Sequence, residues 1–451
     1  MIELKNFRWK NWAGNHSCIA QQYFEPQSEE EISEIVKHAA ASGKKIRVCG
    51  AGHSFSPIAL SDEFLVSLKN YHKLISVTKN TITVQGGMYL HELYAILQQH
   101  QLSLSNFGVI NKQTVAGALA TGTHGSGLKH KSLSAGIEKI KLVTANGELL
   151  EIKRDTEITL NGKKLNLWEA ASVSLGLLGI VSEVTLRCEP LFYLRSEETV
   201  VDADVYTECM DDYARRYEYF KAWWFPHTGK VYLYKAERVG EELYKNKKEH
   251  ENYSADQKKR DVEIDKVTAP LFIKSNSDTS LIPKINKDAL DFYFTPRTRI
   301  GNGFEILVHD ETVPMVVSEY GLSMENGNHR SALKELMQKA EKSAHKIHFP
   351  VDLRYTASET SWLSPSYGRD TFYIGMCVRE WKKKEIPAQM KLFFDIMHHH
   401  HARPNWGKLT DLSATELKKL YPRLEDFITV KNYFDPEGRW DNGFTGGVFW
   451  S

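Results

Sequence analysis

The 451-residue sequence has little cysteine and almost no net charge. Its five cysteines are widely spaced, odd in number and never arranged as CxxC, which is typical of free thiols in a reducing compartment rather than of a disulfide framework. The 58 basic and 57 acidic side chains leave a formal charge of +1. No overall field would therefore draw the protein to nucleic acid or to an anionic membrane.

Long apolar runs and the common nucleotide-binding signatures are also missing. The N-terminus has no apolar core of signal-peptide length, and no later stretch reaches ~18 uninterrupted apolar residues. We therefore expect a cytoplasmic protein without an integral membrane segment. Neither GxGxxG nor GxxxxGK[ST] occurs, which disfavours the usual nicotinamide and ATP folds.

What the sequence does contain is enough length for more than one core, so two domains are expected. Ser28 and Glu31 form a capping box before a helical pattern, and 46–49 is a short apolar run that predicts a strand before a glycine-rich loop. Further strand-like runs include 304–309 and 372–378. Composition changes near residue 190, where we expect a second domain to begin.

Two glycine-rich loops, 50–54 and 115–127, are the main local signals. Glycines let a backbone approach a pyrophosphate closely and point several amide N–H groups at it. His53 stands at the tip of the first glycine turn. From the chemistry alone, it is either a ligand contact held by the backbone or, as the favoured alternative, an imidazole that caps the loop.

The run 47–56, Arg-Val-Cys-Gly-Ala-Gly-His-Ser-Phe-Ser, resembles a known pyrophosphate loop. It is that of the vanillyl-alcohol oxidase and p-cresol methylhydroxylase superfamily of FAD oxidoreductases, in the branch of sugar-1,4-lactone oxidases and alditol oxidases. In many members of that branch the loop histidine is bonded to the 8α-methyl group of the flavin, whereas members with leucine there hold FAD without the bond. The resemblance implies covalent FAD at His53.

The resemblance spans nearly the whole chain, and the segment 106–127 is its most specific part. Other similar segments are 9–12 at the start, 176–185 at the strand that closes the FAD domain, 348–354 and 362–369 on the substrate side, and 435–440 in the C-terminal return. The fold it implies is α+β, with an FAD-binding domain of the p-cresol methylhydroxylase (PCMH) type at 1–190, a separate substrate (cap) domain at 191–405, and a segment 406–451 that returns to the FAD domain.

Residues at matching positions are expected to contact the cofactor. They are Val48, Cys49, Gly50, Ala51, Gly52, His53, Ser54, Thr114, Gly117, Leu119, Gly122, Thr123, His124, Gly125, Val181 and Asn405. Asn405 is a departure, because the family motif His-Trp-x-Lys has histidine at this position. The lysine of that motif is present as Lys408.

Oxidation of an alcohol by flavin needs a base or a strong polarising donor beside the carbinol, and the candidates are Lys408, Glu319 and Arg354. A buried lysine would act electrostatically. Without the resemblance, a surface salt bridge is the preferred interpretation of Lys408, and Glu319 is either exposed at a strand edge or directed into a cleft. The family has a glutamate and an arginine among its substrate contacts near these positions.

Gly108 bears on the electron acceptor. In this family a small residue shortly before the second FAD loop opens access for dioxygen to the flavin, whereas lactone-oxidising dehydrogenases tend to carry alanine there, so the resemblance favours an oxidase that makes hydrogen peroxide. On the residues alone, Gly108 simply makes a turn. The expected substrate is an aldono-1,4-lactone such as gulono- or arabinono-1,4-lactone, with open-chain alditols such as xylitol as the alternative.

Other functional classes stay open on the sequence. A flavin-binding protein that has lost catalysis would account for Asn405, and a nicotinamide-dependent enzyme is opposed by the missing fingerprint. The run His398–His401 suggests a metal, since imidazole is the common zinc ligand. Consecutive histidines point in different directions on a helix or strand, so we expect a solvated helix end and no metal site.

Overall fold

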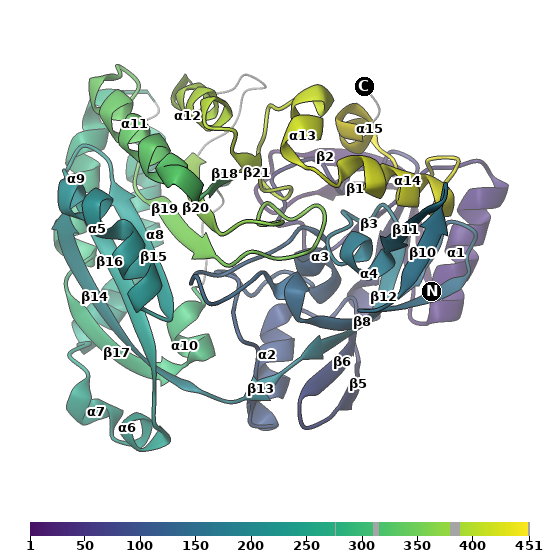
Figure 1. Ribbon diagram of the computed structural model, residues 1–451, viewed down its shortest axis with the longest axis horizontal. Coiled ribbons are helices and arrows are strands. Elements are labelled where there is room, and N and C mark those ends of the chain that lie inside the picture. Colours follow the sequence, from purple (N-terminus) through teal and green to yellow (C-terminus); the bar gives the residue numbers. More distant parts are fainter. Residues whose placement is uncertain (276, 310–314, 379–387, 450–451) are drawn as a thin grey trace.

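The computed structural model describes residues 1–275, 277–309, 315–378 and 388–449. It is an α+β structure in which two smaller sheets, formed by the first part of the chain, lie beside one large antiparallel sheet (Figure 1). Within those ranges, no helix combines the length and the apolar character that a membrane crossing requires. All five cysteines carry free thiols.

The first small sheet has four strands, and its last two pairings are parallel. In spatial order the strands are β1 (Ile2–Lys10), β2 (Ser17–Glu25), β4 (Phe64–Ser67) and β3 (Ile46–Cys49). The crossover between β2 and β3 is helix α1 (Glu29–Ala41), whose first turn is capped by the Ser28 hydroxyl accepting from the backbone N–H of Glu31. The predicted helix and the predicted strand at 46–49 are thus confirmed.

The second small sheet is antiparallel and carries the helices of the glycine-rich region. Its strands, in spatial order, are β5 (Leu74–Val77), β6 (Thr81–Gln85), β12 (Ile180–Arg187), β8 (Ile137–Val143) and β9 (Leu149–Lys153). The associated elements are helices α2 (Leu90–Gln99), α3 (Val115–Ala120) and α4 (Leu167–Ala171), and the two-stranded ladders of β7 (Leu102–Ser103) with β13 (Glu189–Pro190) and of β10 (Glu157–Leu160) with β11 (Lys163–Asn166).

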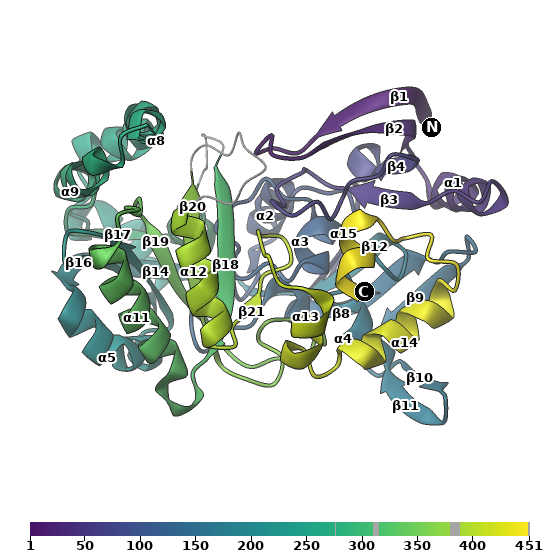
Figure 2. The same ribbon diagram turned by 90° about the horizontal axis from the view of Figure 1, so that it is seen from above.

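The large sheet is built from the middle of the chain. Its eight strands, in spatial order, are β17 (Arg297–Asn302), β14 (Tyr193–Asp202), β16 (Lys230–Val239), β15 (Tyr219–Phe225), β19 (Val351–Thr356), β20 (Thr371–Val378), β18 (Val316–Ser323) and β21 (Arg403–Pro404). Helices α5 (Ala203–Arg216), α11 (Asn328–Lys342) and α12 (Ala388–His399) pack against one face (Figure 2). The other helices of this region are α6 (Glu241–Lys245), α7 (Lys247–His250), α8 (Ala255–Ser275), α9 (Ile282–Tyr293) and α10 (Gly303–Leu307).

Helix α10 contradicts the strand that the apolar run 304–309 predicts. Asn302 accepts from the backbone N–H of Glu305 at 3.0 Å, and the Glu305 carboxylate accepts from the Asn302 N–H at 2.8 Å. This reciprocal cap begins a helix and satisfies two backbone donors that a strand would have paired elsewhere. The Asn-x-x-Glu spacing was visible in the sequence and outweighs the β-forming character of the run.

The last part of the chain returns to the first small sheet through helices α13 (Ala414–Leu420), α14 (Leu424–Phe434) and α15 (Gly443–Phe449), as Figure 1 shows. The backbone N–H of Ile46 donates to the carbonyl of Arg439, and the buried Arg47 guanidinium donates to the carbonyls of Ile58, Leu175 and Trp440. The strand that leads into the first glycine-rich loop is therefore held by residues from both ends of the chain.

Candidate active site

A cavity of about 1120 Å³, including the open space at its mouth, is lined by both glycine-rich regions. Of the residues expected to contact the cofactor, those that line it are Val48, Cys49, Gly50, Ala51, Gly52, His53, Ser54, Thr114, Gly117 and Val181. Further lining residues are Gly86 and Tyr89, which the sequence analysis did not single out, and Gly176 and Gly179, which belong to its segment 176–185. Gly86 was a readable signal, since it follows directly after β6.

Small residues let the two loops approach each other. A side-chain carbon at Gly50 would lie 2.5 Å from the Thr114 hydroxyl, which itself caps α3 by accepting from the backbone N–H of Gly117. Gly52 has a φ of +75° and packs against Trp9 and Asn11, so a side chain there would be strained as well as crowded. Only glycine fits at these two positions without rearrangement.

The loop after Gly52 is anchored on two sides. The backbone N–H of Trp12 donates to the carbonyl of Gly52 at 2.9 Å, and the Asn11 amide donates to the carbonyl of Ser54 at 3.0 Å. From the other end of the chain, the carbonyl of Gly407 accepts from the backbone N–H of Phe55 at 2.7 Å. This anchoring fixes the backbone on both sides of His53.

His53 lines the first cavity and has an unpaired ring nitrogen. Its Nδ1 atom is buried and has no hydrogen-bond partner among the described residues. Burial, reinforced by the positive charges of Lys408 and Lys112, lowers the pKa of His53 to about 4. The imidazole is therefore neutral at physiological pH, with a nitrogen that the protein itself leaves unsatisfied. The loop-capping interpretation does not account for that nitrogen.

The face of the large sheet opposite α5, α11 and α12 carries the polar residues. Tyr355, Phe372 and Tyr320 contact those helices. Because successive side chains alternate between faces, their neighbours Arg354, Tyr373 and Glu319 point to the other side. A row of cross-strand neighbours lies on the same side. Asp352 pairs with both Trp223 and Gly375, and Gly375 pairs with Glu319.

Glu319 is a buried carboxylate with several cationic neighbours. It is only 2% exposed and accepts hydrogen bonds from the Asn405 amide at 2.7 Å and from His124 Nε2 at 3.3 Å. Burial by itself raises the pKa of this carboxyl, but His124, Arg354 and Lys408 outweigh that effect and hold the pKa well below its usual value. Glu319 is thus ionised and only weakly basic.

The two candidate cations are held by different neighbours. Arg354 Nε donates to Asp352 at 2.5 Å, and its Nη1 atom lies 4.0 Å from Glu319. Lys408 lies over the Phe55 ring, with its Nζ atom 4.8 Å from the ring centroid. The charge of Lys408 lowers the pKa of both His53 and Glu319, so this lysine acts on the first glycine-rich loop and on the polar face of the large sheet.

A second cavity, of about 430 Å³ including open space, lies at that polar face. It is lined by Gly125 and Ser126 from the second glycine-rich region and by Lys221 and Arg354 from the large sheet, together with aromatic and apolar side chains. Lys221 was not predicted, and Asp352 was included only as part of the segment 348–354. Lys221 is a charged residue inside an otherwise apolar strand, and this pattern could have identified it.

Several predicted residues lie away from the first cavity. His124 and Asn405 bind Glu319, and Gly125 lines the second cavity. Leu119 is in the core, Gly122 makes a turn with a φ of +68°, and Thr123 accepts from the Gln113 amide at 3.0 Å. Their contact with a cofactor therefore stays a prediction.

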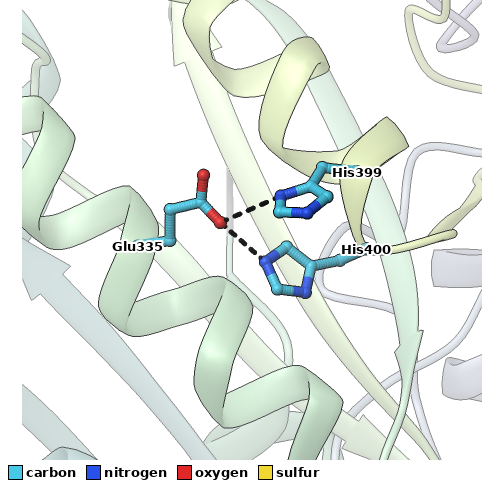
Figure 3. Close-up of side chains that lie close together, drawn as sticks. All are labelled: Glu335, His399 and His400. Atoms are coloured by element: carbon cyan, nitrogen blue, oxygen red, sulfur yellow. Dashed lines mark hydrogen bonds and ion pairs between the residues drawn. The ribbon is translucent and has the colours of Figure 1, made fainter.

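Two residues of the histidine run converge instead of diverging. Helix α12 ends at His399, so His400 leaves the helical path and both rings face Glu335 on α11, at 3.3 and 2.8 Å (Figure 3). The three groups could hold a metal ion. Hydrogen bonding and ion pairing with Lys339, and then with the histidines, lower the pKa of Glu335 to about 2, and these contacts already satisfy the carboxylate. The group lies on the helix-covered face of the sheet and is not part of either cavity.

Comparison with known proteins agrees with this geometry. Residues 20–153 match the model of an FAD binding domain. Cholesterol oxidase from B. sterolicum has a similar structure, with a TM-score of 0.73 and 15% identity over 99% of this chain and 97% of that one. Fold and cavity thus define a two-domain FAD-binding protein of the PCMH type.

The remainder of the chain is more specific. Residues 184–446 match the family model described as D-arabinono-1,4-lactone oxidase, and the chain belongs to this family. It is 29% identical to the L-gulono-1,4-lactone dehydrogenase of Mycobacterium tuberculosis and 29% identical to the L-gulonolactone oxidase of Scyliorhinus torazame, in each case over 98% of both chains. It is also 33% identical to the D-arabinono-1,4-lactone oxidase of Kluyveromyces lactis, over 53% of this chain and 45% of that protein.

Asn405 gives a prediction about stability. In Asn405→Ala the buried Glu319 carboxylate loses a donor, so the free energy of unfolding should fall by about 1–3 kcal/mol at pH 7. In Asn405→Asp a second carboxylate faces Glu319. That variant should be less stable than Asn405→Ala at pH 7 and approach it at pH 5, because protonation of the pair relieves the repulsion. Urea unfolding at both pH values measures this.

The matched control is Asn80→Ala, at an exposed turn, which should change stability by less than about 0.5 kcal/mol. Equal stability of Asn405→Ala and Asn405→Asp at both pH values would contradict the contact with Glu319.

Proposed function

We propose that the protein is an FAD-dependent oxidase of an aldono-1,4-lactone, of the D-arabinono- or L-gulono-1,4-lactone type, which oxidises a hydroxyl-bearing carbon and reduces dioxygen to hydrogen peroxide. The observation that carries the proposal is the position of Lys408. Its Nζ atom lies over the ring of Phe55, next to the first glycine-rich loop, and its backbone N–H donates to the carbonyl of Asn405, whose side chain binds Glu319. Family membership and the names of the relatives support the substrate class.

The proposed domain boundaries follow the sheets. Residues 1–190 form the FAD-binding domain and 191–405 the substrate domain, whose strands make up the eight-stranded sheet. Residues 406–451 return to the FAD-binding domain, in agreement with the hydrogen bonds between Arg47 and Trp440 and between Asn442 and Leu60. The reacting atoms of cofactor and substrate would then meet between the two cavities.

The first cavity fits FAD, and we propose that His53 holds it covalently through the 8α-methyl group. The neutral imidazole and its unpaired Nδ1 atom favour bond formation, because a neutral ring has one nitrogen with an available lone pair and no described residue competes for Nδ1. Backbone N–H groups of 50–54 would bind the pyrophosphate, and Thr114 and Val181 would lie along the cofactor.

Bound FAD supplies a hydride acceptor at its N5 atom. Oxidation removes a hydride from the carbinol carbon and a proton from its hydroxyl group, and the proton would be released to solvent water. As the proton leaves, negative charge grows on the substrate oxygen, and Arg354 and Lys408 are the cations proposed to stabilise it. Glu319 is too weakly basic to remove the proton efficiently. Its proposed role is to hold Arg354, His124 and Lys408 in place by charge and hydrogen bonding.

Gly108 supports dioxygen as the electron acceptor. A side-chain carbon at this position would lie 2.7 Å from the Thr123 methyl group, so an alanine would fill the space between the two segments and push Thr123 aside. With glycine the two segments pack closely here, and the link between a small residue at this position and dioxygen comes from the family resemblance. The relatives carry both oxidase and dehydrogenase names at equal identity, so the acceptor depends on this local argument.

The alternatives are an alditol oxidase acting on xylitol or sorbitol, a lactone dehydrogenase using another acceptor, and a flavin-binding protein without catalysis. Arg354, Lys408 and the second cavity would bind hydroxyl groups of either a lactone or an alditol. We place the lactone first because of the family.

The first prediction from the proposed function tests the flavin bond. Acid-denatured wild-type protein should keep its yellow chromophore on the polypeptide, and His53→Ala should release nearly all of it. The matched control is His16→Ala. His16 also lines the first cavity, but its Nε2 atom is hydrogen-bonded to the Phe55 carbonyl at 2.9 Å, so the colour should stay. Release from the wild type would contradict the covalent bond, and colourless native protein would contradict FAD binding.

A second prediction concerns the substrate. Peroxide formation should be faster, by about tenfold or more in kcat/KM, with D-arabinono- or L-gulono-1,4-lactone than with xylitol. Arg354→Met should lower kcat/KM by about 100-fold or more, because a charge that stabilises the transition state is lost. The control Arg195→Met, at an exposed position on β14, should leave the rate unchanged.

The alternatives give different results in this assay. Faster oxidation of xylitol indicates the alditol oxidase. Dye reduction without peroxide indicates the dehydrogenase, and flavin that no lactone or polyol reduces indicates the non-catalytic protein.

A third prediction concerns Gly108. Gly108→Ala should slow reoxidation of the reduced flavin by dioxygen at least about tenfold, with much less effect on reduction of a dye. The double variant Gly108→Ala, Thr123→Ser removes the methyl group that the alanine would displace. If the alanine itself blocks the route, reoxidation stays slow in the double variant. Full recovery of reoxidation in the double variant would contradict a direct block and indicate displacement of Thr123.

A further inference from the structure

The second cavity contains a buried cation that the proposed chemistry does not use. Lys221 lies on β15 and is only 8% exposed. It pairs across the sheet with Tyr234 and precedes Trp223 by two residues, so all three side chains share one face. Its Nζ atom lies 4.4 Å from the Tyr234 ring centroid and 5.0 Å from that of Trp223. The two rings therefore stabilise the ammonium group without using its hydrogen atoms.

Only one polar contact of this ammonium is formed within the described part of the chain. The Lys221 Nζ atom lies 2.8 Å from His309 Nε2, and no described carboxylate comes within 4.0 Å of it. Burial, together with the charges of Lys221 and three arginines, lowers the pKa of His309 far below its usual value. The imidazole is thus neutral, so Nε2 accepts from Lys221 and holds the ammonium in one position.

An ammonium has three hydrogen atoms to donate, and His309 takes one. The other two have no acceptor among the described residues, although the group lines a cavity that also contains Arg354. A buried donor without an acceptor is costly, and such groups occur where a ligand completes them. A ring lactone that carries hydroxyl groups is a small molecule with several oxygen atoms that could accept these hydrogen bonds.

We propose that Lys221 is a substrate-binding residue, whose ammonium group, positioned by His309, donates hydrogen bonds to hydroxyl or carbonyl oxygens of the aldonolactone in the second cavity. This inference rests on the proposed function and extends it to the binding of the substrate part that is not oxidised. Arg354, on the neighbouring strand, then acts at the reacting oxygen, while Lys221 determines how tightly the lactone is held.

The proposal has a pH signature. Burial lowers the pKa of Lys221 to about 8, an effect increased by Arg354 and Arg299 and opposed by Asp352 and Glu198. The ammonium is present below that pH and is lost as the pH rises through it, so binding should weaken above about pH 8. An arginine keeps its charge throughout this range, and Lys221→Arg should remove the dependence.

The experiment is anaerobic stopped-flow reduction of the flavin by L-gulono- or D-arabinono-1,4-lactone between pH 6.5 and 9.5. Its concentration dependence gives the substrate Kd, and its limiting value gives the rate constant of reduction. For Lys221→Met we expect a Kd about 10–100-fold higher with a limiting rate within about threefold of wild type. For wild type we expect Kd to rise above about pH 8, and for Lys221→Arg a nearly constant Kd.

The matched control is Lys230→Met on the neighbouring strand β16, where the lysine is partly exposed and paired with Asp202, and both constants should be unchanged. A thermal unfolding curve and the flavin content check that each variant is folded. If Lys221→Met does not fold, the pH profiles of wild type and Lys221→Arg still decide.

Two results would overturn the proposal: an unchanged Kd in Lys221→Met, or a fall in the limiting rate without a change in Kd, which would assign Lys221 to the chemical step. If no lactone reduces the flavin of the wild-type protein, the proposed function itself is contradicted, and so is the proposed binding of an aldonolactone by Lys221.

Discussion

The insertion of the second glycine-rich loop into the large sheet is the interaction on which the rest of the site depends. Strands β15 and β19 pair over only three residues each, 222–224 with 351–353, and then separate. In the gap, the Ser126 hydroxyl donates to the Phe220 carbonyl and accepts from the Tyr355 N–H, while the Gly127 N–H donates to the Tyr355 carbonyl at 2.8 Å. The same loop begins at the first cavity, so its insertion fixes the distance between the two cavities.

That constraint also explains the distribution of charge. The residues beside the insertion are Lys221 on one strand and Arg354 on the other, and each would be costly to bury alone. Asp352 and Glu319 compensate Arg354, but Lys221 is stabilised by aromatic rings and a neutral imidazole. Arg354 is thus neutralised by carboxylates, whereas Lys221 has only neutral partners among the described residues. Two hydrogen atoms of the Lys221 ammonium therefore stay available for a ligand, which a structural ion pair would not require.

The sequence predicts those parts of the fold and the site that depend on short segments of the chain, and it does not predict those that depend on distant strands. The glycine-rich loops, His53 and the first sheet depend on short runs and tight turns, and the cavity at 50–54 lies where those runs indicate. Asp352 and Lys221 belong to the site because strands more than a hundred residues apart align in register, and a single sequence does not state that alignment. The convergence of His399 and His400 on Glu335 likewise depends on where α12 ends, not on the composition of the run.

Asn405 shows how register can preserve a function when a motif changes. Its backbone N–H donates to the Glu319 carbonyl and its side chain donates to the Glu319 carboxylate, while its own amide oxygen accepts from the Gly407 N–H. A neutral histidine can donate one side-chain hydrogen bond to that carboxylate, and the asparagine does the same from a shorter side chain. The turn that carries Lys408 is closed by the Asn405 carbonyl in either case. Loss of the family histidine therefore leaves both the charge on Glu319 and the position of Lys408 in place, which argues against the loss of catalysis that the substitution first suggested.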